Sequence, residues 1–365
     1  MRTGAHHRCV TGAFGHCTRD ADGAPPYTAR MHQVSIAVIG GGIAGLSCAA
    51  ELLRGDATVT VFERSRGLGG RLATRRHGQL AFDQGVQFMT ARSRSFARFA
   101  TVAARSGVAA PWRPRLLEDH RSFDQPIEDW LVGTPGMSSM LRPLTRNLEL
   151  QTGVSVHELV QGQRGWELQT DSGRENRIFN AVVVALPAPE AMTLLGPHGR
   201  VFRRLGEVKM APCWTLMAAF DRPLGAAAQA YRWTSGTLTW AACDSSKPGR
   251  PQTAEAWVAH ASPEWSRQYL NADAADTAQL LLKELTHALG VAIPAPAHLE
   301  AHRWRHARVE QPLGVPCLID EEIGAGTCGD WCIAPRAEAA FESGRSLAHS
   351  VLSMVGLSAP ALLRS

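Results

Sequence analysis

One stretch, residues 34–71, constrains the fold of this chain more than any other. It begins with an apolar run of the kind that forms a strand buried on both faces of a parallel sheet, and residues 46–53 are expected to form the next helix. Between them stand glycines in the spacing G-x-G-x-x-G: Gly40, Gly42 and Gly45. The first permits a sharp turn, the second lets backbone N–H groups approach a pyrophosphate, and the third lets the helix pack closely on the strand. The pattern predicts a dinucleotide-binding unit.

An acidic residue ends the second predicted strand, which covers residues 58–62. Glu63 lies about 20 positions past the glycines, where a carboxylate can accept hydrogen bonds from the hydroxyls of an adenosine ribose. A 2′-phosphate in that place would set like charges about 4 Å apart, at a cost of about 4 kcal/mol for an effective dielectric constant of 20. The nucleotide is therefore predicted to be FAD or NAD, and not NADP.

A second glycine loop, residues 64–71, follows Glu63 and separates these two cofactors. It ends on Gly69, Gly70 and Arg71, and the arginine can reach the same pyrophosphate through a charge-assisted hydrogen bond. A nicotinamide-binding Rossmann domain does not need this loop, whereas flavin-binding domains of the glutathione-reductase type commonly carry it. The loop therefore favours FAD. The alternative for the whole stretch is a glycine-rich turn without a ligand.

Later segments return to the first domain after a long insertion. Residues 178–185 are an apolar run that leads into a proline-rich turn, typical of a buried strand whose end lies at the ligand-binding edge of a sheet. Near the C-terminus a short strand ends on Asp330, ahead of a helix over residues 335–355. Asp330 could bind a ribityl hydroxyl, or it could simply cap the helix. Residues 200–310 alternate tryptophan-rich stretches with one strong helix, which predicts an antiparallel sheet with a helix.

We therefore expect an α/β fold, in which a Rossmann-like FAD-binding domain of the glutathione-reductase type carries an inserted α+β substrate domain with an antiparallel sheet. The FAD-binding domain is expected to comprise residues 33–95, 145–199 and 315–365. The substrate domain is expected to comprise residues 96–144 and 200–314. Residues 1–32 show no hydrophobic period and are expected to form a disordered extension.

Composition excludes several other classes of protein. The net charge of +5 comes from arginines spread along the chain, without the dense basic block typical of nucleic-acid binding. No apolar run approaches the roughly 18 residues needed to span a bilayer, so no membrane partner is expected. The cysteines are scattered and no secretory signal precedes them, so no disulfide framework is expected. The only close pair, Cys328 and Cys332, has a spacing that suits neither a C-x-x-C redox motif nor a zinc knuckle. We expect a cytoplasmic protein without a metal.

A resemblance to a known family rests on seven short segments of the chain: residues 63–71, 87–92, 133–137, 208–212, 247–250, 302–304 and 328–332. With these segments, the chain resembles a bacterial renalase-like FAD-dependent oxidoreductase of the monoamine oxidase-like flavoprotein superfamily. The resemblance extends from residue 34 to about residue 355. It implies an oxidase that converts 2- and 6-dihydro isomers of NAD(P)H to NAD(P)+ and reduces O2 to hydrogen peroxide. Its partners would be this small-molecule substrate and O2.

The loop chemistry and the resemblance together predict the FAD contacts: Gly40, Gly42, Ile43, Ala44, Gly45, Glu63, Arg64, Gly70, Arg71, Val86, Gln87, Val156 and Asp330. The substrate contacts implied by the resemblance are Phe88, Met89, Thr90, Ala91, Arg92, Trp112, Arg113, Cys213 and Arg336. Phe88 and tryptophans would stack on the nicotinamide, while Arg92 or Arg113 could bind its carboxamide or the phosphates. FAD is expected to be non-covalent, because no cysteine or histidine stands in a convincing attachment context.

No catalytic side chain is expected. Loss of a hydride turns a dihydropyridine into an aromatic pyridinium, so the protein has only to place the donor carbon over the flavin. An FAD-dependent amine oxidase is the main alternative, because related oxidases place a lysine near the flavin N5, and Lys209 could be that residue or a solvated one. Such an enzyme needs two parallel aromatic rings facing the flavin, for which the chain offers only Tyr27, Tyr231 and Tyr269 as tyrosines. A non-catalytic flavin-binding protein is the second alternative.

Overall fold

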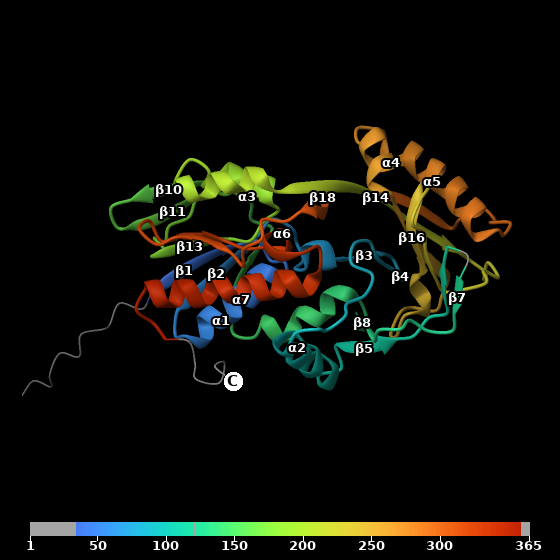
Figure 1. The fold of residues 1–365 in the computed structure, drawn as a ribbon, viewed down its shortest axis with the longest axis horizontal. Helices are drawn as coiled ribbons and strands as arrows, with labels where there is room; N and C mark the ends of the chain where they lie inside the picture. Colours follow the sequence, from blue (N-terminus) through green and yellow to red (C-terminus); the bar gives the residue numbers. More distant parts are fainter. Residues whose placement is uncertain (1–33, 120, 359–365) are drawn as a thin grey trace, which may run out of the picture. The chain divides into compact units, whose positions relative to one another are not determined.

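A computed structural model of the chain describes residues 34–119 and 121–358. A six-stranded sheet carries the predicted nucleotide-binding stretch (Figure 1). Its strand order is β19 (Leu318–Asp320), β20 (Ala325–Thr327), β13 (Ala181–Val184), β1 (Ser35–Ile39), β2 (Thr58–Glu63) and β9 (Glu149–Thr152). All neighbouring strands pair in parallel except β19 and β20, which pair antiparallel. The carboxyl ends of the parallel strands therefore meet at one edge, where ligands of such sheets bind.

Different elements cover the two faces of this sheet (Figure 1). Alternate residues of β1 face α1 (Ile43–Arg54) and α7 (Ala337–Met354) on one side. The others face α3 (Ala188–Leu195) and a small antiparallel sheet on the other side. That small sheet consists of β10 (Val156–Gly162), β11 (Gly165–Thr170) and β12 (Gly173–Arg174). Both faces of β1 are thus buried, as its continuous apolar run predicts.

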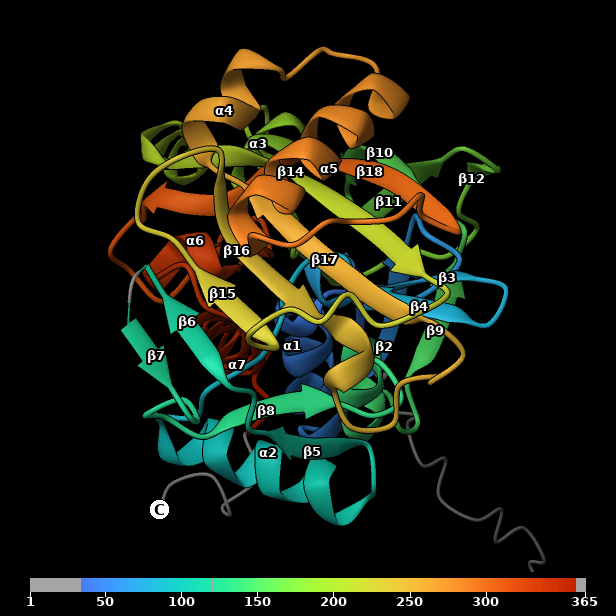
Figure 2. The same ribbon diagram turned by 90° about the vertical axis from the view of Figure 1, so that its right-hand side faces the viewer.

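A seven-stranded sheet forms the second large layer (Figure 2). Its order is β18 (His298–Gln311), β14 (Lys209–Phe220), β17 (Glu255–Ala261), β16 (Leu238–Cys243), β15 (Ala230–Arg232), β6 (Leu116–Glu118) and β7 (Arg121–Phe123). The pairs are antiparallel except β15 with β6. Helix α5 (Ala274–Leu289) packs its buried leucines on one face, and α4 (Pro263–Gln268) lies beside it. On the opposite face, Phe82 of the segment Leu80–Asp83 packs on Met217, Ala219 and Val258, and the part of this face that carries Thr215, His260 and Trp240 lines a cavity.

Shorter elements connect the two sheets. They are the hairpin β3 (Thr74–His77) and β4 (Leu80–Asp83), α2 (Arg94–Arg105), the pair β5 (Ala109–Trp112) and β8 (Trp130–Gly133), and α6 (Asp330–Ile333), with 3-10 turns at Gly70–Leu72, Met137–Leu144, Arg200–Glu207 and Asp244–Ser246. Phe96 and Phe99 of α2 pack on Phe341 of α7 at ring-centroid distances of 5.3 and 5.1 Å. Helix α2 therefore joins the helical layer of the six-stranded sheet, although its sequence lies in the range predicted for the substrate domain.

The α/β prediction is confirmed, with local differences. Within the tryptophan-rich range 200–310, residues 230–243 form two strands, β15 and β16. The C-terminal strand ends at Thr327, and Asp330 already begins α6. The strands of each large sheet all fall within the ranges predicted for one domain, although the division into two domains stays a prediction. The expected disordered extension lies outside the described residues, and none of the described helices has the length and apolar character to cross a bilayer.

Candidate active site

A cavity of about 2140 Å³ is lined by residues from the carboxyl edge of the six-stranded sheet and from the open face of the seven-stranded sheet. Sites for one small molecule are usually about 300–1,000 Å³. The cavity therefore offers room for two large ligands. All predicted FAD contacts line it except Gly45, and of the predicted substrate contacts Phe88, Cys213 and Arg336 do so.

The glycine loop after β1 has the geometry that a dinucleotide needs. Gly40 has a φ of +111°, and a Cβ there would lie 2.5 Å from the carbonyl oxygen of Ala185. A Cβ on Gly45 would lie 2.0 Å from the carbonyl oxygen of Gly40, so this glycine sets the close packing of α1 on the strand and does not face the cavity. A Cβ on Gly42 would meet nothing, which leaves the space beside the N-terminus of α1 to a ligand. The first turn of α1 holds no acidic residue, so its free N–H groups suit a phosphate.

Glu63 is buried at the end of β2, with 8% of its surface exposed. One carboxylate oxygen accepts a hydrogen bond from the N–H of Gly41 at 2.8 Å, and the other accepts from the N–H of Ser65 at 2.8 Å. These bonds fix the carboxylate in the wall of the cavity. Each oxygen keeps further acceptor capacity, which suits ribose hydroxyls.

Arg71 and Asp330 were both predicted to contact FAD, and in the structure they bind each other. The guanidinium donates to the carboxylate at 2.9 and 2.6 Å, and also to the carbonyl oxygen of Ala307 at 3.0 Å. Burial lowers the pKa of Arg71, but the Asp330 charge outweighs it and the net pKa is raised. The pair joins the second glycine loop to the start of α6, and both residues line the cavity. Arg64 likewise lines the cavity and pairs with Glu190 at 3.1 Å.

The predicted substrate segment lines the cavity only at its first residue. Phe88 does so and stacks on Trp130 with ring centroids 3.8 Å apart. The next residue, Met89, is buried and donates its N–H to Leu131 at 2.8 Å. The remaining three, Thr90, Ala91 and Arg92, also lie outside the lining, and Arg92 pairs with Glu128 on the surface at 2.9 Å. A strand bridge at Met89 therefore turns the chain away from the cavity.

Trp112 and Arg113 line a separate small pocket and not the main cavity. Trp112 is 3% exposed, and its indole N–H donates to Ser246 at 3.2 Å. Arg113 extends from the surface toward Asp129. Neither Arg92 nor Arg113 is therefore placed to bind a ligand in the main cavity.

Sequence reasoning did not identify a row of residues that crosses the seven-stranded sheet. The pairing of successive strands sets these residues opposite one another, and all of them line the cavity: His302, Thr215, His260, Trp240 and Arg232. Residues directly opposite in antiparallel strands share one face of the sheet. The row spans five strands whose register no local pattern reveals, so of these residues only His302 lies in a segment that the sequence analysis singled out.

Four buried polar atoms in the cavity wall have no hydrogen-bond partner among the described residues: Gln84 Oε1, Thr215 Oγ1, Trp240 Nε1 and His260 Nε2. An unsatisfied buried polar group costs about 1–3 kcal/mol, so these atoms suit a polar ligand. Burial and the nearby Lys247 charge lower the pKa of His260 to about 4, which leaves its imidazole neutral at pH 7. Burial also raises the pKa of Cys213 to about 12, so its thiol stays protonated.

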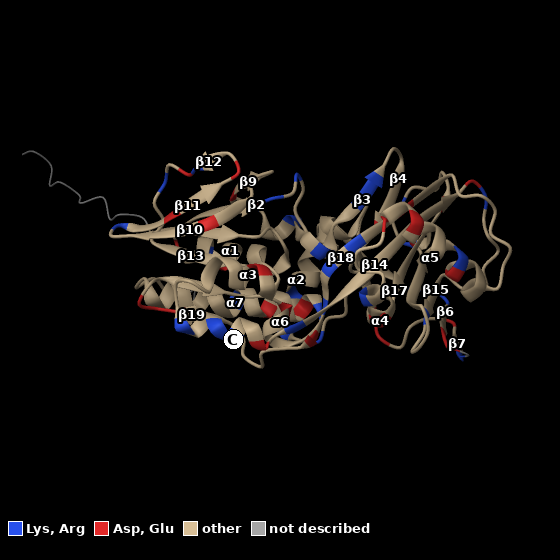
Figure 3. Ribbon diagram, turned by 90° about the horizontal axis from the view of Figure 1, so that it is seen from above, with Lys and Arg blue, Asp and Glu red and all other residues tan. Residues whose placement is uncertain are grey.

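Arginines dominate the charge of the cavity wall. Its arginines are Arg64, Arg66, Arg71, Arg75, Arg76, Arg142, Arg232, Arg303, Arg305, Arg308 and Arg336. The carboxylates there are fewer: Glu63, Glu190, Glu264, Glu300 and Asp330. Figure 3 shows the basic residues along β3 and β18. An excess of one charge in a cavity concentrates ligands of the opposite charge, so the wall favours an anion.

Lys209 and the tyrosines considered for an amine oxidase are not part of the cavity wall among the described residues. Lys209 is exposed at the start of β14 and does not line the cavity. Tyr231 stacks on Trp233 at 5.6 Å and Tyr269 on Trp265 at 4.3 Å, both away from the lining. Tyr27 lies outside the described residues. The structure thus presents no pair of tyrosines to a flavin there.

Known proteins share this fold. A proposed protoporphyrinogen oxidase from Exiguobacterium sp. 255-15 superimposes with a TM-score of 0.70 at 13% identity, covering 87% of this chain and 98% of that one. Cyclohexylamine oxidase from Brevibacterium oxydans IH-35A gives a TM-score of 0.67 at 13% identity over 89% of this chain and 100% of that one. Putrescine oxidase, solved with bound putrescine, gives a TM-score of 0.63 at 11% identity, covering 88% of this chain and 99% of that one. At these identities the likeness establishes the fold alone.

Sequence families identify the chain more closely. Residues 38–102 match the NAD(P)-binding Rossmann-like domain, which covers the glycine loops and Glu63. Residues 116–315 match the family described as flavin containing amine oxidoreductase, which covers more than half of the chain. An oxidoreductase with a flavin cofactor agrees with the glycine cradle, the buried Glu63 carboxylate and the large cavity. The chain belongs to the flavin containing amine oxidoreductase family.

Proposed function

We propose that this protein is a FAD-dependent oxidase that acts on 2- and 6-dihydro isomers of NAD(P)H, with FAD bound non-covalently. The overall reaction would be dihydronicotinamide dinucleotide plus O2 and a proton, giving the oxidised dinucleotide and hydrogen peroxide. The observation that carries the proposal is the cavity of about 2140 Å³ with its excess of arginines. It has the size for FAD and a second dinucleotide together, and the charge for the phosphates of both.

The residues divide into two groups of contacts. The N-terminus of α1 and the Glu63 carboxylate would bind the pyrophosphate and ribose of FAD. The arginines of β18 would bind the substrate phosphates, because a guanidinium matches a phosphate through paired hydrogen bonds. Bound FAD would supply the hydride acceptor and the route of electrons to O2.

The buried polar atoms suit the substrate's carboxamide. This group has one carbonyl acceptor and an NH2 donor, and the wall offers the donor Trp240 Nε1–H and the acceptor Gln84 Oε1. His260 is neutral and adds one further hydrogen-bonding atom. No side chain has to remove a proton, so a neutral imidazole and a protonated Cys213 thiol agree with the proposed reaction.

Amine oxidation is the second candidate function, because it is favoured by the family and by the fold shared with cyclohexylamine and putrescine oxidases. The arginine-rich wall disfavours a protonated amine, which would meet like charges. A flavin-binding protein without turnover is a third possibility that the same assay distinguishes.

The test follows flavin bleaching without oxygen. Purified yellow protein is mixed with borohydride-reduced NAD isomers, with ordinary NADH, or with a panel of monoamines and diamines. Bleaching by the isomers alone supports the proposal, bleaching by amines supports the second candidate, and no bleaching supports the third. After acid precipitation the flavin should remain in the supernatant, because denaturation releases a cofactor that is not covalently bound. A yellow pellet would contradict non-covalent binding.

Two arginine variants sharpen the assignment of the substrate phosphates. Arg305→Gln and Arg308→Gln alter exposed arginines of β18 that line the cavity, and Arg98→Gln alters an exposed arginine of α2 that does not. The first two should raise KM for the isomers by about tenfold each, equivalent to about 1.4 kcal/mol. The control should leave KM unchanged, and equal effects in all three would contradict the assignment.

A further inference from the structure

A buried charge cluster lies behind the cavity wall: Asp83, Asp244, Lys247 and Arg250. We propose that this cluster holds the cavity-lining loop, residues 84–88, in one conformation, and that Lys247 is a positioning residue that acts on the flavin site through Gln87. The inference rests on the proposed flavin site and not on the proposed substrate.

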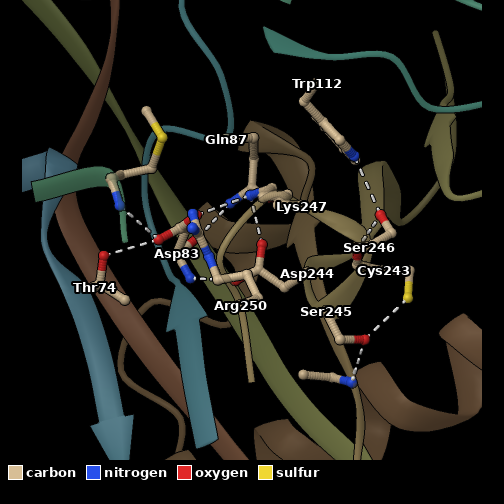
Figure 4. Close-up of polar contacts among 12 residues, drawn as sticks. Thr74, Asp83, Gln87, Trp112, Cys243, Asp244, Ser245, Ser246, Lys247 and Arg250 are labelled. Atoms are coloured by element: carbon tan, nitrogen blue, oxygen red, sulfur yellow. Dashed lines mark hydrogen bonds and ion pairs between the residues drawn. The ribbon is translucent and has the colours of Figure 1, made fainter. Parts of the chain in front are cut away.

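The cluster is buried and joined by ion pairs and hydrogen bonds (Figure 4). The side chains of Asp83, Lys247 and Arg250 are 0% exposed. One oxygen of Asp83 accepts from Lys247 Nζ at 3.1 Å and from the Arg250 guanidinium. The other accepts from the Thr74 hydroxyl at 2.8 Å and from the N–H of Met137 at 3.1 Å. Asp244 supplies the second carboxylate beside Lys247.

The two carboxyl groups differ in their tendency to hold a proton. Burial acts to raise the pKa of Asp83, but the charges of Lys247 and Arg250 outweigh it and the net pKa is lowered. The pKa of Asp244 is raised by burial and by the Asp83 charge. Asp83 is therefore the ionised centre of the cluster.

Two sets of hydrogen bonds join the cluster to the loop. Lys247 Nζ donates to Gln87 Oε1 at 3.2 Å, and Gln87 Nε2 donates to the carbonyl oxygens of Asp83 and of Gly85, the latter at 3.2 Å. Asp244 accepts from the N–H of Asp83 at 2.7 Å, which fixes the end of β4 where the loop begins. The Gln87 amide thus closes the loop on itself, and Lys247 holds that amide (Figure 4).

Every residue of the loop lines the cavity: Gln84, Gly85, Val86, Gln87 and Phe88. Its middle is anchored to the second glycine loop, since the N–H of Val86 donates to the Arg71 carbonyl oxygen at 2.8 Å. A Cβ on Gly85 would lie 2.1 Å from that same oxygen, so only glycine allows this approach. This backbone contact restricts the middle of the loop, and the hydrogen bonds of the Gln87 amide restrict its remaining residues.

A buried ion cluster is a poor device for stability alone. Replacing such a cluster by apolar residues of similar volume is often neutral or stabilising, whereas a charged cluster admits only the arrangement that pairs every charge. Here the cluster that restricts the arrangement of its side chains lies next to the loop that lines the cavity. The cluster joins β4 to the turn Asp244–Ser246, two elements far apart in sequence, at the point where the loop 84–88 begins.

The test replaces one cation and one anion together. Lys247→Met with Asp244→Asn keeps the Asp83–Arg250 pair and removes the bond to Gln87. In the apoprotein, amide hydrogen exchange of residues 84–88 should become faster by about tenfold or more, while other core amides keep their rates. FAD should bind about tenfold more weakly, and the visible circular dichroism of bound FAD should change. The matched control is Glu175→Gln with Arg177→Met, a partly buried ion pair at 2.8 Å whose residues do not line the cavity.

Each outcome decides the proposal. Wild-type exchange of residues 84–88 in the Lys247 variant would overturn it, and so would equal acceleration throughout the chain, which would make the cluster a general stabiliser. If that variant does not fold, Gln87→Met removes the amide and leaves the charges intact, and the same local acceleration is expected. If the wild-type protein binds no FAD, the proposed function fails, while the exchange rates still decide whether the cluster holds the loop.

Discussion

At the scale of single residues, the site depends on groups kept in one protonation state. His260 sits in the middle of the row across the seven-stranded sheet, and its Nε2 has no partner among the described residues. Burial is the larger cause of its lowered pKa, and the Lys247 charge is the second. A neutral ring beside a ligand can donate or accept one hydrogen bond without adding charge to the arginine-rich wall.

This state of His260 predicts a pH dependence of stability. The pKa falls from 6.5 in the unfolded chain to about 4 in the fold, so the unfolded chain binds more protons between these values. The neutral His260 therefore contributes to the free energy of unfolding, on the order of 3 kcal/mol. This contribution is complete above pH 6.5 and is lost as the pH falls toward 4. His260→Gln should remove this part of the dependence. Urea unfolding of both proteins at several pH values measures it, and parallel curves would contradict the expectation.

Glu63 carries a second prediction at this scale. Glu63→Gln removes the charge that accepts hydrogen bonds from two backbone N–H groups and, as proposed, from the ribose. Hydrogen bonds to charged groups are worth about 1.5–3 kcal/mol, so FAD should bind about tenfold to a hundredfold more weakly. Titration of apoprotein with FAD measures the loss. Glu149→Gln, on β9 of the same sheet but outside the cavity, is the control and should bind FAD normally.

At the scale of elements, the nucleotide cradle depends on how closely α7 packs on α1. Gly344 makes this possible, because a Cβ there would lie 2.1 Å from the Ala44 carbonyl oxygen and 2.3 Å from the Ser47 hydroxyl. Ser47 also donates to the Phe341 carbonyl oxygen at 2.9 Å. Ala44 belongs to the first turn of α1 and lines the cavity, so the packing of α7 sets where this turn lies.

Gly344→Ala should therefore force the two helices apart. Overpacking of this kind costs about 1–3 kcal/mol of unfolding free energy, and the displaced first turn of α1 should also weaken FAD binding. The control is Gly206→Ala, since a Cβ at Gly206 meets nothing within 4 Å. Urea unfolding and FAD titration of both variants provide the measurement. A Gly344 variant as stable as the control would show that the helices separate without cost.

At the scale of the whole molecule, two sheets from interleaved parts of the chain meet around one cavity whose wall carries more arginines than carboxylates. Such a field acts over about 10 Å at 0.1 M salt and over about 3 Å at 1 M. Under the proposed function, it would attract the anionic dinucleotide at low salt and repel a protonated amine.

Ionic strength consequently separates the two candidate substrates. With dihydro-NAD isomers, kcat/KM should fall severalfold as NaCl rises from about 0.01 to 0.5 M, because screening weakens the attraction. With a cationic amine it should rise. Initial rates of oxygen consumption measure both, with an uncharged dihydropyridine as the salt-independent reference. A rise with salt for the isomers would contradict the proposed binding of their phosphates by arginine.

The sequence predicted the parts of the site that depend on neighbours along the chain. Strand, glycine turn, helix and Glu63 form one local unit, and the structure reproduces that unit within a few residues of the expected bounds. The predicted substrate segment reaches the cavity only at Phe88, because the strand bridge between Met89 and Leu131 turns the chain away from the cavity. No local sequence pattern indicates that Trp112 and Arg113 line a pocket separate from the main cavity.

The sequence by itself determined the nucleotide-binding unit, because glycine conformations and apolar periodicity act between residues close together in the chain. Only the tertiary structure decided which side chains share the cavity wall. The row through Thr215, His260 and Trp240 exists because three strands pair in one register, and Lys247 reaches Asp83 across 164 positions. Strand register and buried charge pairing depend on the packing of the entire molecule, and no local pattern encodes them.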